Sequence, residues 1–288
     1  MSKPLKLIHL VIILCLSVFA FSTHSIASQK DGLLRINFFD VGQGDAIFIE
    51  TPSGQQVLID GGPDNRVLSK LGEVMPFYDK DIDLVVVSHP HADHMVGLID
   101  VLERYEVKNI IEARESYGSG EFRAWQESVK NEEANNIEAI AGKEVDLGDG
   151  TILTILHPFE SVAGDNPKNP HDDVVVAVLK YGELEVMLTG DMETEVERRL
   201  IMDGYNLDSD VLKVGHHGSK TSSSEEFLTA VSPETAIIQV GEKNRYGHPS
   251  SEILERLENY GIKYYRNDLN GDIKLISDGI NYQIIAHP

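Results

Sequence analysis

Three histidines and an aspartate stand within six residues in the segment HPHADH (89–94), one serine after the apolar run LVVV (84–87). Imidazole nitrogens suit zinc and its first-row neighbours, and a carboxylate oxygen widens the choice towards manganese or iron. In extended backbone, side chains two positions apart point the same way, so His89, His91 and Asp93 are expected to converge. His94 then points elsewhere, as a ligand of a second ion would. A polar loop stiffened by Pro90 is the alternative, but this spacing is far more restrictive and predicts metal binding.

Further candidate residues follow other apolar runs. Asp191 could cap the helix predicted after it, which contributes about 1 kcal/mol, or its two oxygens could hold two cations about 3.5–4 Å apart. Asp60 is either a turn residue or a hydrogen-bond partner that fixes the tautomer of a ligand imidazole. His216 and His217 are adjacent in the chain, so their side chains diverge and only one should reach a metal ion directly.

The elements that must position these residues alternate between strands and helices. Strands are predicted from apolar, β-branched runs between Gly, Pro and Asp turns, at 34–39, 46–50, 56–59, 84–88, 151–156, 174–181, 184–189, 211–214, 236–240, 263–265 and 272–276. Helices are predicted from apolar residues at helical spacing, at 93–105, 122–135, 193–203, 224–231 and 250–260. Ser223, three residues before Glu226, indicates a capping box for the helix near 224–231 rather than a nucleophile. Two β-layers covered by helices would bury all these apolar faces.

The pattern H-x-H-x-D-H after an apolar strand resembles the signature of the metallo-β-lactamase superfamily, whose members hydrolyse lactams, thioesters, lactones and phosphodiesters. Within it, the chain is similar to the C-terminal extracytoplasmic domain of the competence DNA-uptake protein ComEC and its free-standing relatives. The segments that carry this likeness are FDVGQGD (39–45), LIDGG (58–62), LTGD (188–191), LKVGHHGS (212–219) and YGHPS (246–250). The resemblance implies one hydrolase domain over 34–288, an α/β fold of the αββα sandwich type. It does not specify a substrate, because one fold hosts many chemistries.

The resemblance also implies roles for several residues. Asp191 would bridge two metal ions. His216 would be a ligand of the second ion with His217 nearby in the pocket, and the reverse assignment stays open. Asp93 would be a ligand that also orients the attacking water. His248 would donate a proton to the leaving group or contact substrate, unless it only belongs to the loop that enters the last helix.

The remaining ligand of the first ion is expected from the histidines ahead of Asp191. The competence branch often has Asn in this region with Ser two residues on, whereas this chain has His171, Asp172 and Asp173. His171 is therefore expected to complete the first metal site. His157 is the weaker candidate and is assigned to a loop at the end of a strand. The departure from Asn and Ser leaves the extent of the nuclease analogy open.

The first 27 residues are typical of a secretory signal peptide. Lys3 and Lys6 precede an apolar run at 7–21, and small residues near Ala27 suit a cleavage site. An uncleaved anchor is the alternative. Cys15 is the single cysteine of the chain, so cleavage after Ala27 would leave a mature protein whose metal ligands are His and Asp. We expect an exported, extracytoplasmic protein.

The formal net charge is −22, and it becomes −24 when two lysines leave with the signal peptide. So large an acidic excess repels polyanions and argues against a general nucleic-acid binder. A nuclease remains possible, because divalent ions and a local basic patch can hold a phosphate. Four basic residues near the motifs could form such a patch or could be scattered solubilising charges: Lys213, Lys220, Lys243 and Arg245.

Hydrolysis is the reaction that these residues favour. Two divalent ions, zinc or manganese, would lower the pKa of a shared water towards 7 and stabilise charge on a carbonyl or phosphoryl oxygen. The leading hypothesis is an exported phosphodiesterase or nuclease, acting on a small-molecule or nucleic-acid phosphodiester. The alternatives are a metal-dependent esterase or lactonase, and a non-catalytic metal-containing binding protein. The sequence indicates no obligate protein partner and no transmembrane channel segments.

Overall fold

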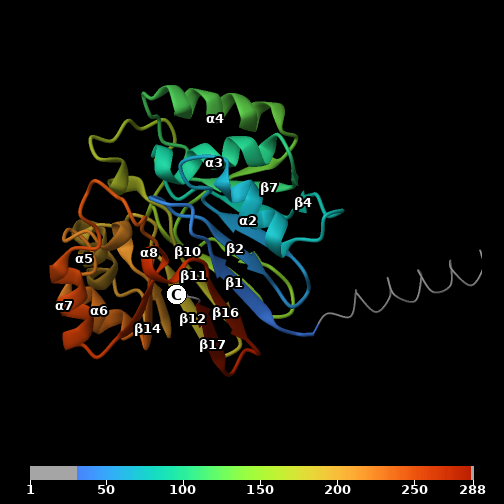
Figure 1. Ribbon diagram of the computed structural model, residues 1–288. Coiled ribbons are helices and arrows are strands. Elements are labelled where there is room, and N and C mark those ends of the chain that lie inside the picture. Colours follow the sequence, from blue (N-terminus) through green and yellow to red (C-terminus); the bar gives the residue numbers. More distant parts are fainter. Residues whose placement is uncertain (1–30, 287–288) are drawn as a thin grey trace, which may run out of the picture.

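A computed structural model describes residues 31–286, so the predicted signal peptide (1–27) lies outside the described residues. Two large mixed sheets face each other, and helices cover the outer face of each (Figure 1). Figure 1 shows α2, α3 and α4 together on one side of the molecule and α5, α6 and α7 on the other. The predicted αββα sandwich is confirmed.

The first sheet holds eight strands in the order β17 (Tyr282–Ala286), β16 (Ile273–Ser277), β1 (Leu34–Phe38), β2 (Ile47–Glu50), β3 (Gln56–Ile59), β5 (Leu84–Val86), β7 (Asn109–Glu112) and β8 (Asn135–Glu138). The second holds seven strands in the order β15 (Lys263–Arg266), β14 (Thr235–Ile238), β13 (Val211–Lys213), β12 (Leu184–Leu188), β11 (Val176–Tyr181), β10 (Thr151–His157) and β9 (Glu144–Asp146). A small parallel pair joins β4 (Asp81–Ile82) to β6 (Glu106–Val107).

The helices are α2 (Arg66–Val74), α3 (Ala92–Leu102), α4 (Gly120–Asn131), α5 (Thr194–Met202), α6 (Glu225–Val231), α7 (Ser251–Asn259) and the short α8 (Asn267–Asn270). Two 3₁₀ turns, η1 (Pro170–Asp173) and η2 (Gly215–Gly218), lie in loops of the second half. Among residues 31–286, no helix combines the length and the apolar character needed to cross a membrane.

Alternate side chains of each central strand are buried on opposite faces. In β2, Ile47 and Ile49 pack between the two sheets, whereas Phe48 packs under the helices of the first sheet. In β12, Val186 faces the other sheet and Met187 faces the helices of the second. Burial on both faces explains why these strands are apolar runs instead of alternating patterns.

Some predicted elements differ from the structure. The helix predicted at 122–135 ends at Asn131, and the chain forms strand β8 from Asn135. The predicted Ser223 cap is wrong, because Ser224 caps α6 by accepting a hydrogen bond from the Phe227 backbone NH. Ser223 itself has a left-handed φ of 50°.

The candidate residues gather because several parallel strands end at the same edge of the sandwich. Asp60 follows β3 and His89 follows β5 in the first sheet, while Asp191 follows β12 and His217 follows β13 in the second. Helix α3, which starts between His91 and Asp93, packs backbone to backbone on the turn after β3. A Cβ atom on Gly97 would lie 2.0 Å from the Gly61 carbonyl oxygen, so glycine alone fits this crossing.

Candidate metal centre

Four side chains form the first group of metal-ligating atoms: His89, His91, His171 and Asp191, with one donor atom of each lying within 4.8 Å of the others. His91 Nδ1 lies 2.9 Å from His89 Nε2 and 3.2 Å from His171 Nε2. Both Nε2 atoms are 3.8 Å from Asp191 Oδ2. Three imidazole nitrogens and one carboxylate oxygen thus converge on one point, which is a ligand set that zinc and related ions accept.

A second group shares the same aspartate: Asp45, His94, Asp191 and His217. Here the other carboxylate oxygen is used, since Asp191 Oδ1 lies 3.3 Å from His94 Nε2 and 3.5 Å from His217 Nε2. The two oxygens of Asp191 therefore face different groups. This is the arrangement in which one carboxylate can bridge two ions.

Orphaned polar atoms show that cations fit this centre. Four buried atoms of the second group that could ligate a metal have no hydrogen-bond partner within residues 31–286: Asp45 Oδ1, His94 Nε2, Asp191 Oδ1 and His217 Nε2. Leaving a buried polar atom without a partner costs about 1–3 kcal/mol, and several in one place are rare unless something else satisfies them. Divalent ions would satisfy them all at once.

The electrostatics keep the ligands in contrasting states. Burial disfavours the charge of Asp191, but His217 and His94 hold its pKa well below the usual value, so it stays a carboxylate. Burial and the nearby charge of His94 lower the pKa of His89 well below 6.5, which keeps that imidazole neutral. Asp191 and Asp45 outweigh burial and raise the pKa of His217 to about 10. Bound cations would replace the protons that now balance these buried carboxylates.

Hydrogen bonds behind the second group fix its imidazoles. His94 Nδ1 donates to Asp60 Oδ2 at 2.8 Å, as expected for Asp60, and the Ser88 backbone NH donates to the other oxygen of Asp60 at 2.7 Å. His217 Nδ1 donates to the Gln239 carbonyl oxygen at 2.9 Å. With a cation in place of its second proton, each ring would keep a proton on Nδ1 and present Nε2 to the centre.

Two carboxylates in the site were not predicted. Asp45 pairs with the fully buried Lys213, whose Nζ lies 2.5 Å from Asp45 Oδ2. Glu193 Oε1 lies 3.6 Å from His171 Nδ1 and 3.2 Å from His216 Nδ1, so one carboxylate orients two imidazoles. Asp45 lies within the motif FDVGQGD, which was a visible signal, but nothing local marked Glu193.

The geometry differs from the sequence-based assignment at His216 and His217. His217 joins His94 in the second group, whereas His216 forms a third group with His171 and Glu193, and its Nε2 atom lies 3.7 Å from Asp191 Oδ2. Both residues have left-handed φ values, 47° and 53°, which turn the two rings to different sides. The structure therefore favours His217 over His216 for the second ion.

Asp93 also lies elsewhere than expected. The extended segment ends at His91, because α3 begins at Ala92, and Asp93 then sits in the first helical turn. Its Oδ2 atom is 3.5 Å from His217 Nε2, on the side of the second group. His89 and His91 converge as predicted, but Asp93 does not join them.

The remaining predicted residues are His248 and His157. His248 lines the mouth of the centre, a hollow of about 140 Å³ that Gln43, Asp93 and Tyr246 also line. His157 is not in it. Its Nδ1 atom donates to the Val174 carbonyl oxygen at 2.6 Å.

His171→Ala is expected to lower the bound metal from about two ions per chain towards one, because it removes one of three imidazoles from the first group. His157→Ala is the matched control and should leave the metal content unchanged, since its ring contacts Phe159 and backbone instead. Elemental analysis of both purified variants measures this. If His157→Ala lost the metal and His171→Ala kept it, His171 would not be a ligand.

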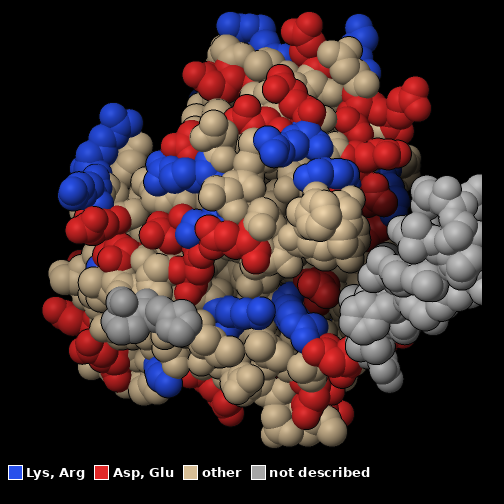
Figure 2. All heavy atoms as spheres, turned by 45° about the vertical axis from the view of Figure 1, so that its right-hand side comes forward, with Lys and Arg blue, Asp and Glu red and all other residues tan. Residues whose placement is uncertain are grey.

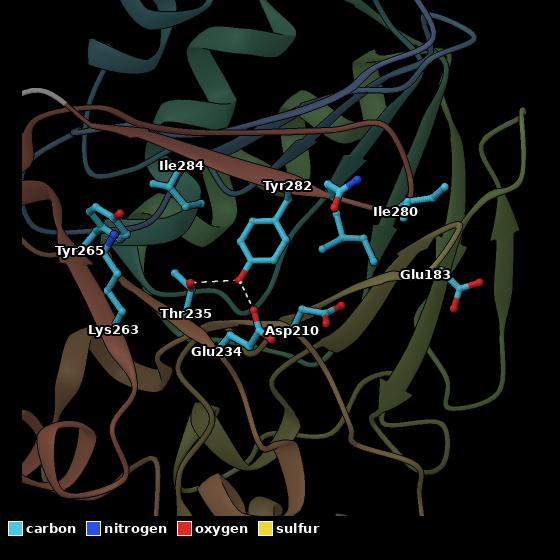
Figure 3. A pocket seen from close by; sticks show the side chains of 11 residues that line it. Glu183, Asp210, Glu234, Thr235, Lys263, Tyr265, Ile280, Tyr282 and Ile284 are labelled. Atoms are coloured by element: carbon cyan, nitrogen blue, oxygen red, sulfur yellow. Dashed lines mark hydrogen bonds between the residues drawn. The ribbon is translucent and has the colours of Figure 1, made fainter.

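A larger hollow of about 540 Å³ lies away from the metal centre, where strands β12, β14 and β15 of the second sheet begin (Figure 3). Its lining includes Glu183, Asp210 and Glu234, and the Tyr282 hydroxyl donates to Glu234 at 3.4 Å. It contains no imidazole. Imidazoles that could bind a metal therefore line the smaller hollow and not this one.

Comparison with known proteins identifies the family to which this chain belongs. The family model described as the metallo-beta-lactamase superfamily matches residues 39–242. The ComE operon protein 3 of Bacillus subtilis (strain 168) is 32% identical over 83% of this chain and 32% of its own length. The competence protein ComA of Neisseria gonorrhoeae is 31% identical over 83% of this chain and 32% of its own. The chain thus spans about a third of the length of these curated relatives.

Among solved structures, the diiron beta-hydroxylase CmlA from Streptomyces venezuelae is similar at a TM-score of 0.52. It is 15% identical and covers 88% of this chain and 54% of its own. At that identity the likeness concerns the fold alone. It agrees with the sandwich architecture described above.

Proposed function

The chain belongs to the metallo-beta-lactamase superfamily, and from this premise we propose that it is a dinuclear metal-dependent hydrolase that cleaves phosphodiester bonds. The observation that carries the proposal is the pair of metal-ligating groups that share Asp191, one carboxylate oxygen facing each. Such a pair suits a phosphodiester, in which attacking and leaving oxygens develop charge on opposite sides of phosphorus.

The ligands divide between two ions, which we expect to be zinc or manganese. The first ion would be held by His89, His91, His171 and Asp191, and the second by His94, His217 and Asp191, with Asp93 or Asp45 beside them. When bound, two such ions lower the pKa of water towards 7 and stabilise negative charge on phosphoryl oxygens.

The protein's own groups would orient the reactants. The Asp93 carboxylate lines the mouth of the centre and would accept a hydrogen bond from the attacking water. The His248 ring lies 5.6 Å from the His216 ring and would donate a hydrogen bond to the leaving oxygen. They come from different elements, α3 and the loop before α7, and both line the same hollow of about 140 Å³, so a substrate in this hollow would lie beside both.

The relatives and the surface charge bear on the substrate. One curated relative is named a competence protein, which supports a substrate related to DNA. Figure 2 shows Lys and Arg side chains scattered among Asp and Glu side chains on one face, in keeping with a net charge of −22. A broad duplex-binding surface would need clustered basic residues, so phosphate recognition by local groups fits this protein better.

The proposal is tested by incubating the purified protein with manganese or zinc and five substrates: single-stranded DNA, double-stranded DNA, a simple phosphodiester, a lactone and a β-lactam. We expect phosphodiester cleavage that stops on addition of a chelator and returns with metal. Metal-dependent lactone hydrolysis without phosphodiester cleavage would overturn the proposed substrate class. The proposal that the protein is a metal-dependent hydrolase would still stand.

A further inference from the structure

The loop between β14 and α7 carries a line of rings from the metal centre to the surface. The His248 ring follows the His216 ring, and Tyr246 stacks on His248 with ring centroids 5.8 Å apart and planes at 12°. The Arg245 guanidinium lies 5.1 Å from the Tyr246 centroid and donates to its hydroxyl at 3.1 Å. Tyr246 is 54% exposed, yet it also lines the mouth of the centre.

This loop is organised before any ligand arrives. The Asn244 side-chain oxygen accepts hydrogen bonds from the backbone NH groups of Tyr246, at 3.2 Å, and His248, at 2.9 Å. Its amide nitrogen donates to the carbonyl oxygens of Gly241, at 3.0 Å, and His248, at 2.8 Å. One side chain thus fixes the turn that presents Tyr246, and a ligand would lose little entropy in ordering it.

The loop is also fastened to the metal centre at both ends. The Gly241 backbone NH donates to Gln43 Oε1 at 3.3 Å, which turns the Gln43 amide nitrogen towards the interior without a described partner. At the other end, the Ser250 backbone NH donates to the Gly218 carbonyl oxygen at 2.9 Å. Gly218 belongs to η2, the turn that carries His216 and His217. The rings of His248 and Tyr246 are therefore held in a fixed position relative to the metal-ligating histidines.

We propose that this loop recognises single-stranded nucleic acid, with Tyr246 stacking on a base beside the scissile phosphate and Arg245 contacting the neighbouring phosphate. The inference rests on the proposed phosphodiesterase function and specifies its substrate. An exposed ring beside a cationic guanidinium is the combination that single-strand binders use. In a duplex the bases are already stacked and cannot reach Tyr246, so the loop selects for unpaired strands.

The binding test compares two single strands of twelve nucleotides, one made of thymidine and one abasic. Both have phosphorothioate backbones, which resist cleavage. Fluorescence anisotropy with the metal-loaded protein should show about tenfold tighter binding of the thymidine strand, since a base stacked on an aromatic ring contributes about that factor. Tyr246→Ala should abolish the difference and Tyr246→Phe should retain it. Phe77→Ala is the matched control, an 89% exposed aromatic in the loop after α2, and should bind like the unchanged protein.

The Arg245 contact is tested through salt. Each phosphate contact to a single strand changes the slope of log K against log salt concentration by about 0.7. Arg245→Ala should make this slope shallower by about that amount for both strands, whereas Arg198→Ala, on the exposed face of α5, should leave it unchanged. An unchanged slope in Arg245→Ala would remove Arg245 from the proposal.

Failure of this inference is distinguishable from failure of the proposed function. If Tyr246→Ala keeps the preference for thymidine over abasic strands, the stacking role is overturned, even when a base-free phosphodiester is hydrolysed. If base-dependent binding is found but no phosphodiester is cleaved, the recognition role stands and the proposed hydrolysis is overturned. A duplex that binds as tightly as the single strand would overturn the selection for unpaired bases.

Discussion

Asp191→Ala is expected to lower kcat/KM for a phosphodiester by about a thousandfold or more, and to reduce bound metal from about two ions per chain to less than one. The physical reason is that both oxygens of this carboxylate face ligand groups, so one substitution removes a donor from each. Loss of a single charge-stabilising group in an active site already costs about 10²–10³-fold. Steady-state kinetics and elemental analysis on the same preparation measure the two effects.

Asp203→Ala provides the matched carboxylate control. Asp203 lies at the far end of α5, where its half-exposed carboxylate forms a surface ion pair with Arg199 at 3.7 Å, so activity and metal content should not change. If Asp191→Ala kept two ions and most of its activity, the bridging assignment would be abandoned.

Gly97→Ala is expected to destabilise the protein by about 3 kcal/mol, because the new methyl group would lie 2.0 Å from the Gly61 carbonyl oxygen and 2.6 Å from that of Asp64. Both contacts are backbone atoms, so the clash is relieved only by moving α3 away from the turn after β3. For a domain of this size the melting temperature should fall by about 10 °C. Since α3 carries His94, metal affinity should fall as well.

Gly72→Ala is the control for this prediction. Gly72 lies in α2, and a Cβ atom there would meet no atom within 4 Å. Alanine is the better helix former by about 1 kcal/mol, so this variant should melt at the same temperature or slightly higher. Thermal unfolding followed by circular dichroism compares the two, and equal melting temperatures would show that the α3 crossing tolerates a side chain.

The sequence predicted eleven of the seventeen strands in residues 31–286, and the ligand-rich segment, because both are local patterns. The apolar runs at 84–88 and 184–189 became β5 and β12, and His89 and Asp191 follow them at one edge of the sandwich. Short edge strands such as β8 and β9 were missed, since their residues are mostly polar and half-exposed. Pairing with a neighbour, which no local pattern reveals, makes them strands.

The site was harder to predict wherever backbone direction decided the outcome. Asp93 was expected beside His91, but a helix that begins one residue earlier turns it towards His217. The choice between His216 and His217 depends on the left-handed φ values of both residues, which the amino-acid sequence does not indicate. Glu193 was missed because its role exists only once His171 and His216 are brought together from distant parts of the chain.

The metal-ligating residues are divided between the two sheets, and this division affects the stability of the protein and its resistance to proteases. His89, His91 and His94 follow a strand of the first sheet, while His171, Asp191 and His217 lie next to strands of the second, so each bound ion ties the two layers together. An ion at a hundred times its dissociation constant adds about 2.7 kcal/mol to the free energy of unfolding. In surroundings poor in such ions, the chain would stop working and become easier for proteases to cut, so metal supply would govern its turnover as well as its catalysis.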